Sequence, residues 1–333
     1  MSHPERLALG VDLGGSKVLA GVVDSRGKML SRDYSATLAH HGPAAVVRVL
    51  TEAMRRAIAG ASIEISQIEA IGIAAAGISD PRTGILHSSP HLPKWKDVPL
   101  RDIIERELGV RTVLGNDANA AALGEFCFGA GRGARNLIFI TLSTGIGGGI
   151  IIDGKLYAGA SGAAGEVGHM TIDVNGPRCE CGNTGCWEAL ASGTALAREA
   201  RKSIREGATT AILEQAGGDI EQVTAQTVHA AALAGDAVAR ELIGRTAYYA
   251  GVGFANLINL FNPELVIVGG GLSNLGDMLL VPAIKVAGER AFQAAFKAAR
   301  FVPAQLGDTS GVVGAAALAL GGGSSPLEGG RTG

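Results

Sequence analysis

The chain has 333 residues and a formal net charge of −2, and hydrophobic residues make up 47% of it. This charge balance gives no electrostatic reason to expect nucleic acid or an anionic membrane as a partner. No apolar run is long enough to span a bilayer and the N-terminus lacks a hydrophobic signal core, so we expect a cytoplasmic protein that is long enough for two domains.

The first part of the chain reads as strands joined by turns, followed by helices. Buried strands are predicted at 7–12, 17–23, 28–35, 68–75 and 110–114, and helices at 43–59, 100–108 and 119–129. The opening strands are separated by two glycines and by a second turn signal, which indicates a hairpin meander. The mixture of strands and helices predicts an α/β protein.

The pattern of strand, glycine turn and strand returns further along the chain. Strands are predicted at 136–143, 150–153, 265–268 and 301–305, and helices at 193–206, 226–234, 236–260, 281–299 and 311–320. The repetition suggests two halves of similar topology. The Gly/Ser/Pro-rich tail from residue 321 onward is expected to be disordered.

The first glycine turn has the composition of a phosphate-binding element. Asp12 ends a predicted strand, Gly14 and Gly15 form the turn, and Ser16 and Lys17 follow. Backbone N–H groups at such a turn can cradle phosphate oxygens, and Asp12 can hold Mg²⁺ through water. The alternative interpretation is an ordinary hairpin turn with a solvated aspartate.

The second glycine turn offers similar chemistry. Thr144 can donate its hydroxyl, while Gly145, Gly147 and Gly148 leave their backbone N–H groups unobstructed. The spacing matches neither a Walker A loop nor a Rossmann fingerprint. A third cluster, which includes Gly270 and Gly271, could approach a nucleoside, although glycines at strand ends are common in α/β proteins.

Asn116 and Asp117 stand where a predicted strand gives way to a helix. An aspartate at such a junction commonly caps the helix. The alternative is a general base that accepts a proton from a substrate hydroxyl as that oxygen attacks a phosphoryl group.

A cluster of cysteines follows the second turn. Cys179, Cys181 and Cys186 are three of the four cysteines in the chain, and His169 lies upstream of them. Three thiolates and an imidazole satisfy the tetrahedral preference of Zn²⁺ with no open position, which is typical of a structural site. Disulfide bonding is the alternative, but a cytosolic protein favours metal at this spacing.

Several motifs in one order resemble a known family. The region from the second glycine turn through Glu166 and His169 to the cysteines and Glu188 closely resembles the signature of the ROK family of sugar kinases and repressors. The first glycine turn matches the first phosphate motif of that family, and Asn116-Asp117 matches its catalytic motif. The resemblance covers nearly the whole chain.

The resemblance implies the hexokinase–actin-like (ribonuclease H-like) α/β fold, with two domains and the active site in the cleft between them. A small N-terminal domain is expected at 1–118 together with about 310–322, and a large domain with the zinc loop at 119–309. Residues 323–333 would form the disordered tail. A homodimer or homotetramer is expected.

The resemblance also implies roles for individual residues. Asp117 would be the catalytic base, and the sugar would be held by Gly77, His91, Asn116, Asp117, Glu166, His169 and Glu188. ATP would be held by Asp12, Gly14, Gly15, Ser16, Lys17, Thr144, Gly145, Gly147, Gly148, Gly270 and Gly271, and Zn²⁺ by His169, Cys179, Cys181 and Cys186. The chain departs from the family pattern at Ala76, usually Pro, and at His91, usually Asn.

The activity that the resemblance implies is ATP- and Mg²⁺-dependent phosphorylation of the 6-hydroxyl of a hexose, with glucose expected. The two departures put the preferred hexose in doubt, so mannose, fructose and N-acylhexosamine kinases are the alternatives. A sugar-responsive repressor is a further alternative, but the segment ahead of Asp12 is too short for a helix-turn-helix and has no basic patch.

Overall fold

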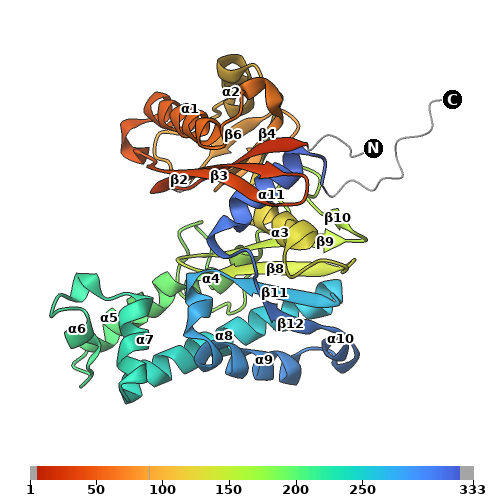
Figure 1. The fold of residues 1–333 in the computed structure, drawn as a ribbon. Coiled ribbons are helices and arrows are strands. Elements are labelled where there is room, and N and C mark those ends of the chain that lie inside the picture. Colours follow the sequence, from red (N-terminus) through yellow and green to blue (C-terminus); the bar gives the residue numbers. More distant parts are fainter. Residues whose placement is uncertain (1–5, 90, 323–333) are drawn as a thin grey trace. The chain divides into compact units, whose positions relative to one another are not determined.

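The computed structural model describes residues 6–89 and 91–322 (Figure 1). These residues form two compact units. Among the described residues, the first unit covers 6–89, 91–139, 149–165 and 304–322, and the second comprises Ile140–Gly148 and Glu166–Pro303. The tail expected to be disordered, 323–333, lies outside the described residues.

The first unit is built on a five-stranded sheet with the strand order β3-β2-β1-β4-β7. Its strands are β1 (Leu7–Leu13), β2 (Lys17–Asp24), β3 (Met29–Ala36), β4 (Ile68–Ala75) and β7 (Thr112–Asn116). β1, β2 and β3 are antiparallel, which confirms the predicted meander, whereas β4 and β7 run parallel to β1. A separate ribbon of β5 (Ile78–Asp80) and β6 (Ile85–Ser88) was not predicted.

Helices cover both faces of this sheet, as Figure 1 shows for α1 and α11. The helices of the first unit are α1 (Pro43–Gly60), α2 (Leu100–Leu108), α3 (Asp117–Phe128) and α11 (Ser310–Ala319). Alternate residues of β1 point to opposite faces, so Leu9 packs with α1 and α2 while Ala8 packs against α11. A Cβ atom on Gly10 would lie 2.0 Å from the carbonyl oxygen of Val312. Glycine therefore lets α11 lie directly on the sheet.

The second sheet has the strand order β10-β9-β8-β11-β12. Its strands are β8 (Leu137–Leu142), β9 (Ile146–Ile152), β10 (Lys155–Leu156), β11 (Leu265–Gly269) and β12 (Arg300–Pro303). Both sheets place a hairpin at one side and two later strands at the other, which confirms the predicted similarity of the two halves. The boundary between the units passes through β8 and β9.

β9 begins earlier than predicted. The sequence places a strand at 150–153, but β9 starts at Ile146, so Gly147 and Gly148 lie in the strand and not in the turn. A Cβ atom on Gly149 would lie 2.4 Å from the Cβ of Ala122. Glycine is needed at position 149 because α3 packs closely on this part of the strand, a tertiary cause that local propensity does not reveal.

The remaining helices belong to the second unit. They are α4 (Trp187–Ala191), α5 (Gly193–Arg205), α6 (Ile212–Gln215), α7 (Ala225–Leu233), α8 (Ala237–Phe261), α9 (Asp277–Arg290) and α10 (Gln293–Ala298). The single helix predicted at 281–299 is wrong, because the chain breaks it at Phe292. The backbone N–H of Phe292 donates to Oδ1 of Asn259 at 2.7 Å, so a tertiary hydrogen bond replaces a helical one.

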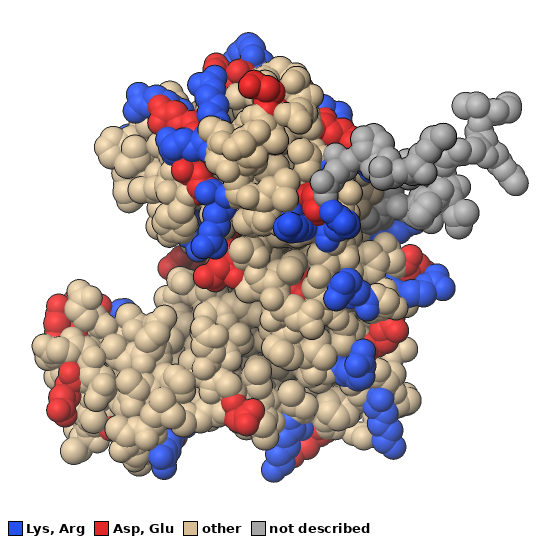
Figure 2. Space-filling view, viewed as in Figure 1, with Lys and Arg blue, Asp and Glu red and all other residues tan. Residues whose placement is uncertain are grey.

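No helix in the described part of the chain is long and apolar enough to cross a membrane. On the face shown in Figure 2, basic and acidic side chains are interspersed. This mixture agrees with the near-neutral charge balance of the sequence.

Candidate active site

The first glycine turn joins β1 to β2. The N–H of Gly14 donates to the carbonyl oxygen of Lys17 at 2.9 Å, and Ser16 is exposed between them. A Cβ atom on Gly15 would lie 2.5 Å from the Cβ of His91. A residue predicted to hold ATP is therefore in direct contact with one predicted to hold the sugar.

Asp12 lies half-buried in β1, close to the first turn of α11. A Cβ atom on Gly311 would lie 2.9 Å from Oδ2 of Asp12, so glycine leaves room for the carboxylate. Burial, together with the nearby carboxylate of Asp117, raises the pKa of Asp12 to about 6, and Lys17 opposes the rise. Two carboxylates thus lie close enough to interact, and oxygen atoms of this kind are the ligands that Mg²⁺ prefers.

Asn116, and not Asp117, caps the helix at this junction. Asn116 is the N-cap of α3, and its Oδ1 accepts from the N–H of Asn119 at 3.1 Å. Asp117 occupies the first helical turn, where its Oδ1 accepts from the N–H of Ala118 at 2.9 Å. Burial raises the pKa of Asp117, while the Ala118 hydrogen bond and the charge of His91 act in the opposite direction. A carboxylate with a raised pKa is a stronger base than an exposed one.

Gly77 lies just after β4, in a backbone conformation that favours glycine. Its φ is 114°, and a Cβ atom there would lie 2.3 Å from the carbonyl oxygen of Ser88. His91 is exposed. The first unit places His91 against Gly15 and close enough to Asp117 for their charges to interact.

The second glycine turn joins β8 to β9 and is held by Glu188. The N–H of Ser143 donates to the carbonyl oxygen of Gly145 at 2.9 Å, and the N–H of Ile146 donates to Oε2 of Glu188 at 2.8 Å. A Cβ atom on Gly145 would lie only 2.3 Å from that oxygen. Thr144 is exposed at the turn. Glu188, predicted as a sugar residue, thus uses one oxygen to fix the predicted phosphate turn.

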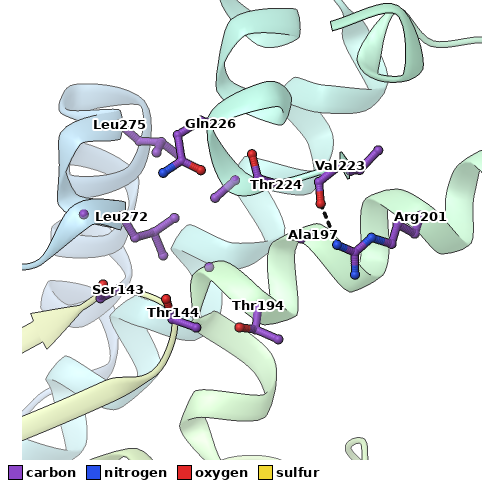
Figure 3. A pocket seen from close by; sticks show the side chains of 13 residues that line it. Ser143, Thr144, Thr194, Ala197, Arg201, Val223, Thr224, Gln226, Leu272 and Leu275 are labelled. Carbon is purple, nitrogen blue, oxygen red and sulfur yellow. Dashed lines mark hydrogen bonds between the residues drawn. The ribbon is translucent and has the colours of Figure 1, made fainter. Parts of the chain in front are cut away.

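The third glycine cluster closes one side of a cavity of about 250 Å³ (Figure 3). Gly270 has a φ of 88°, and a Cβ atom there would lie 2.3 Å from the carbonyl oxygen of Leu142. The cavity is lined by Ser143, Thr144, Gly193, Thr194, Ala197, Arg201, Val223, Thr224, Ala225, Gln226, Gly271, Leu272 and Leu275. An apolar cavity edged with a few hydroxyl and amide groups is typical of a small-molecule site.

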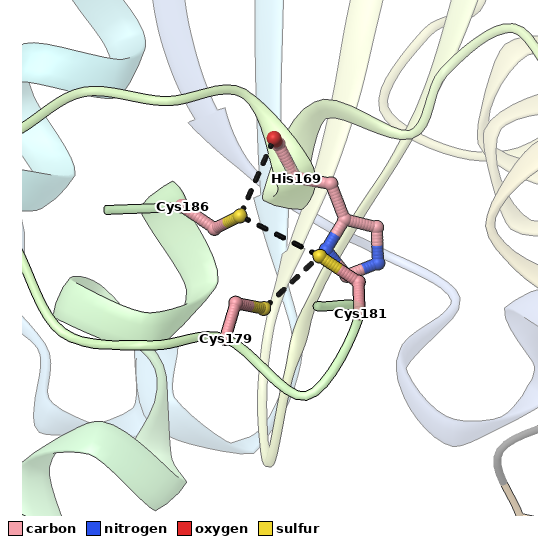
Figure 4. Close-up of side chains that lie close together, drawn as sticks. All are labelled: His169, Cys179, Cys181 and Cys186. Carbon is pink, nitrogen blue, oxygen red and sulfur yellow. Dashed lines mark hydrogen bonds between the residues drawn. The ribbon is translucent and has the colours of Figure 1, made fainter. Parts of the chain in front are cut away.

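The predicted metal ligands converge on one point in the second unit (Figure 4). The ligand atoms of His169, Cys179, Cys181 and Cys186 all lie within 4.8 Å of one another. Sγ of Cys179 lies 3.8 Å from Nδ1 of His169, and Sγ of Cys181 lies 3.7 Å from Sγ of Cys186. A tetrahedron with zinc–sulfur bonds of about 2.3 Å has edges of about 3.8 Å, so this donor set fits Zn²⁺. A disulfide bond needs sulfurs about 2 Å apart.

Glu166 is exposed and directly precedes the short 3-10 helix η3 (Val167–His169). Its carbonyl oxygen accepts from the N–H of His169 at 3.1 Å. Because Nδ1 of His169 faces the sulfurs, Nε2 of the same ring is left for another partner. Glu166 and His169 thus follow each other on one short element beside the cysteine cluster.

Comparison with known proteins settles the family. The model of the ROK family matches residues 8–321. The chain belongs to the ROK family.

The most similar relatives of this ROK protein include both sugar kinases and regulators. It is 41% identical to a glucokinase from Streptomyces coelicolor over 94% of this chain and 97% of the relative. It is 33% identical to a xylose repressor from Caldicellulosiruptor bescii over 94% of this chain, but that match covers 77% of the repressor.

Solved structures confirm the predicted fold class. A crystal structure of a ROK family glucokinase from Streptomyces griseus in complex with glucose and AMPPNP is 40% identical, with a TM-score of 0.81 over 95% of this chain and 100% of that chain. The ROK chain therefore has the hexokinase–actin-like α/β fold, with its two similar sheets as the repeated element.

Sequence reasoning missed most of the cavity wall of this ROK protein. Thr194, Arg201, Thr224 and Gln226 lie on helices α5 and α7 or directly before α7. The sequence predicts both helices, but no glycine motif marks these polar residues as part of a site. Thr144 and Gly271 were the only signals, because both follow apolar strands.

Proposed function

We propose that this protein is an ATP-dependent hexose kinase that phosphorylates the 6-hydroxyl of glucose. The observation that carries the proposal is the half-buried Asp117, which lies at the start of α3 close to Asp12 and whose pKa is raised by burial. The similarity to a glucokinase whose crystal structure holds glucose and AMPPNP supports the same conclusion.

Asp117 would align the 6-hydroxyl and take its proton as the oxygen attacks the γ-phosphorus in line. The bond from the γ-phosphorus to the β,γ-bridging oxygen breaks, ADP leaves, and the proton stays on the Asp117 carboxylate until it is released to water. The raised pKa favours this role, because a general base works best when its pKa approaches the working pH.

The phosphates of ATP would lie against backbone N–H groups of Gly14, Gly15 and Gly145. Asp12 would hold Mg²⁺ through water, and the bound ion would neutralise charge on the β- and γ-phosphates. The nucleoside would occupy the cavity beside Thr144 and Gly271. A cavity of about 250 Å³ is near the lower end of known ligand pockets, which suits one nucleoside and leaves the phosphates outside it.

Hexose hydroxyls need several donors and acceptors, and the chain offers them in two groups. Asn116, His91 and the backbone at Gly77 form the group in the first unit. Glu166, His169 and Glu188 form the group in the second unit. His169 would contact sugar through Nε2 while Nδ1 faces the cysteines.

The cysteine cluster would hold a structural Zn²⁺. Three sulfurs and one imidazole nitrogen leave no open coordination position, so zinc would take no part in phosphoryl transfer. Its chemistry would be to keep the segment between His169 and Glu188 rigid, and with it the residues that hold the sugar.

The test is a coupled ADP-release assay with ATP across glucose, mannose, fructose and N-acetylglucosamine. The proposal expects the highest kcat/KM for glucose. A different preferred hexose would support the kinase activity but change the proposed substrate. His91 would then be the first residue to examine. ADP release with none of these sugars would reject the kinase and favour a sugar-responsive regulator.

A further inference from the structure

Arg201 holds one wall of the cavity through three backbone carbonyls. Nε donates to the carbonyl oxygen of Ile220 at 3.2 Å, and Nη2 donates to those of Val223 at 2.8 Å and Glu221 at 3.3 Å. Figure 3 shows the bond to Val223 at the edge of the cavity. Hydrogen bonds from a charged donor are shorter and stronger than neutral ones, so this contact fixes the wall firmly.

The wall needs such support because it connects two short elements. The 3-10 helix η4 (Ile220–Gln222) ends at Val223, and Thr224 is the N-cap of α7, with its side chain accepting from the N–H of Thr227 at 3.3 Å. The carbonyl oxygen of Ile220 already accepts from the N–H of Val223 at 3.2 Å, but carbonyl groups at the end of a helix commonly lack a partner within that helix. Arg201 supplies the donor from α5 and so links the two elements.

The hydrogen bonds of Arg201 determine the positions of the polar side chains in this wall. Thr224 and Gln226 follow directly after Val223 and line the cavity, while Thr144 and Gly271 line it from the glycine turns. Val223 itself is fully buried. Releasing Val223 would therefore move Thr224 and Gln226 and change the shape of the cavity.

We propose that Arg201 is a positioning residue of the nucleotide site. It holds the segment from Ile220 to Gln226 against α5, so that the cavity keeps the shape that the nucleoside of ATP needs. The inference rests on the proposed function, because it takes the nucleoside as the occupant. Arg201 acts on binding of the nucleoside in the ground state and the transition state alike, so its loss should raise KM for ATP without lowering kcat.

The test compares R201M and R201K with R205M. Arg205 lies one turn further along α5, where its side chain is 59% exposed and its Nη2 donates at 2.9 Å to the side chain of Glu221. R201M should raise KM for ATP roughly ten-fold, the scale of a lost charged hydrogen bond, and leave kcat and the KM for hexose within about two-fold. R201K keeps the charge but lacks the planar fork, so its KM should be intermediate. R205M should match the wild type.

Calorimetric titration with a non-hydrolysable ATP analogue supplies a readout that does not depend on turnover, and R201M should weaken this binding by the same factor. An unchanged KM for ATP in R201M and R201K, or an equal rise in R205M, would overturn the inference. If R201M fails to fold, R201K alone decides. A wild-type protein that transfers no phosphate would reject the proposed function, whereas an active wild type with unaltered Arg201 variants rejects only this inference.

Discussion

The two glycine turns arise from the same pattern of strand, turn and strand, yet they are held in different ways. The first, at 14–15, is closed within its hairpin and by Thr37, whose Oγ1 donates to the Gly14 carbonyl oxygen at 2.7 Å. The second is held by Glu188 and by the N–H of Gly193, which donates to the Ser143 carbonyl oxygen at 2.7 Å. The first turn thus depends on local chain, and the second on residues that follow much later.

The proposed catalytic carboxylates and the proposed nucleoside cavity are divided between the units of the two turns. The two carboxylates, Asp12 and Asp117, lie in the unit of the first turn, whereas the cavity and the cysteine cluster lie in the unit of the second. Loss of either carboxylate should therefore slow phosphoryl transfer, whereas changes around the second turn should weaken binding of the substrates.

The largest effect is expected for D117N. The amide cannot accept the proton of the 6-hydroxyl, so kcat should fall about a hundred-fold or more, the scale of a lost general base. The KM for hexose should stay within a few-fold of the wild type. The matched control is D277N, because Asp277 also lies in the first turn of a helix, α9, but is exposed. Normal turnover in D117N would remove Asp117 from the role of base.

The loss of a metal ligand should have the second-largest effect. C181S should release zinc, measured by elemental analysis, and raise the KM for hexose more than the KM for ATP, because the ion orders the segment from His169 to Glu188. C127S is the control: burial raises the pKa of Cys127 to about 11, and this thiol lies on α3 outside the cluster. A wild-type protein without zinc would contradict the metal assignment.

The raised pKa of Asp12 should make the free energy of unfolding of the ligand-free protein depend on pH. Its pKa rises from 3.8 to about 6 on folding, so between these values the folded protein binds more protons than the unfolded chain, and stability falls as pH rises through the window. The cost at pH 8 is at most about 3 kcal/mol, from 1.36 kcal/mol per pKa unit. The D12N substitution should remove this loss of stability.

Urea unfolding at two pH values checks this expectation. D12N should exceed the wild type in stability at pH 8, and the difference should shrink towards pH 4, where the wild-type carboxyl is protonated in the folded state. The same difference at both pH values would contradict the raised pKa. Kinase activity of D12N should fall in either case, because the amide is a poor Mg²⁺ partner.

The smallest effect is expected at Glu188, where two variants separate two roles. E188A leaves the N–H of Ile146 without its acceptor and should raise the KM for both ATP and hexose roughly ten-fold. E188Q can still accept from Ile146 through its amide oxygen, so the KM for ATP should stay near the wild-type value while that for hexose rises. Equal effects of both variants on ATP would contradict the role of Glu188 in holding the second turn.

Much of the fold is predictable from local patterns. β1, β2 and β4 are buried runs bounded by turn signals, and β4 appears with the predicted bounds. The prediction fails where tertiary contacts decide. The glycines at the start of β9 predict a loop from the sequence alone, because the sequence does not show that α3 packs on Gly149. The break before α10 depends on a hydrogen bond to Asn259, which is far away in sequence.

The same contrast holds for the candidate site. The convergence of His169 and the three cysteines is predictable, because glycines and short spacing confine the ligands to one loop. The contact between Gly15 and His91 is not, since nothing in either segment points to the other. Arg201 gives no signal either, because its partners are backbone carbonyls and carry no side-chain pattern.

A crystal structure with glucose and a non-hydrolysable ATP analogue tests the central claim most directly. The account predicts the 6-hydroxyl oxygen of glucose within hydrogen-bond distance of the Asp117 carboxylate, about 2.6–3.2 Å. A bound sugar whose 6-hydroxyl faces away from Asp117 would contradict it.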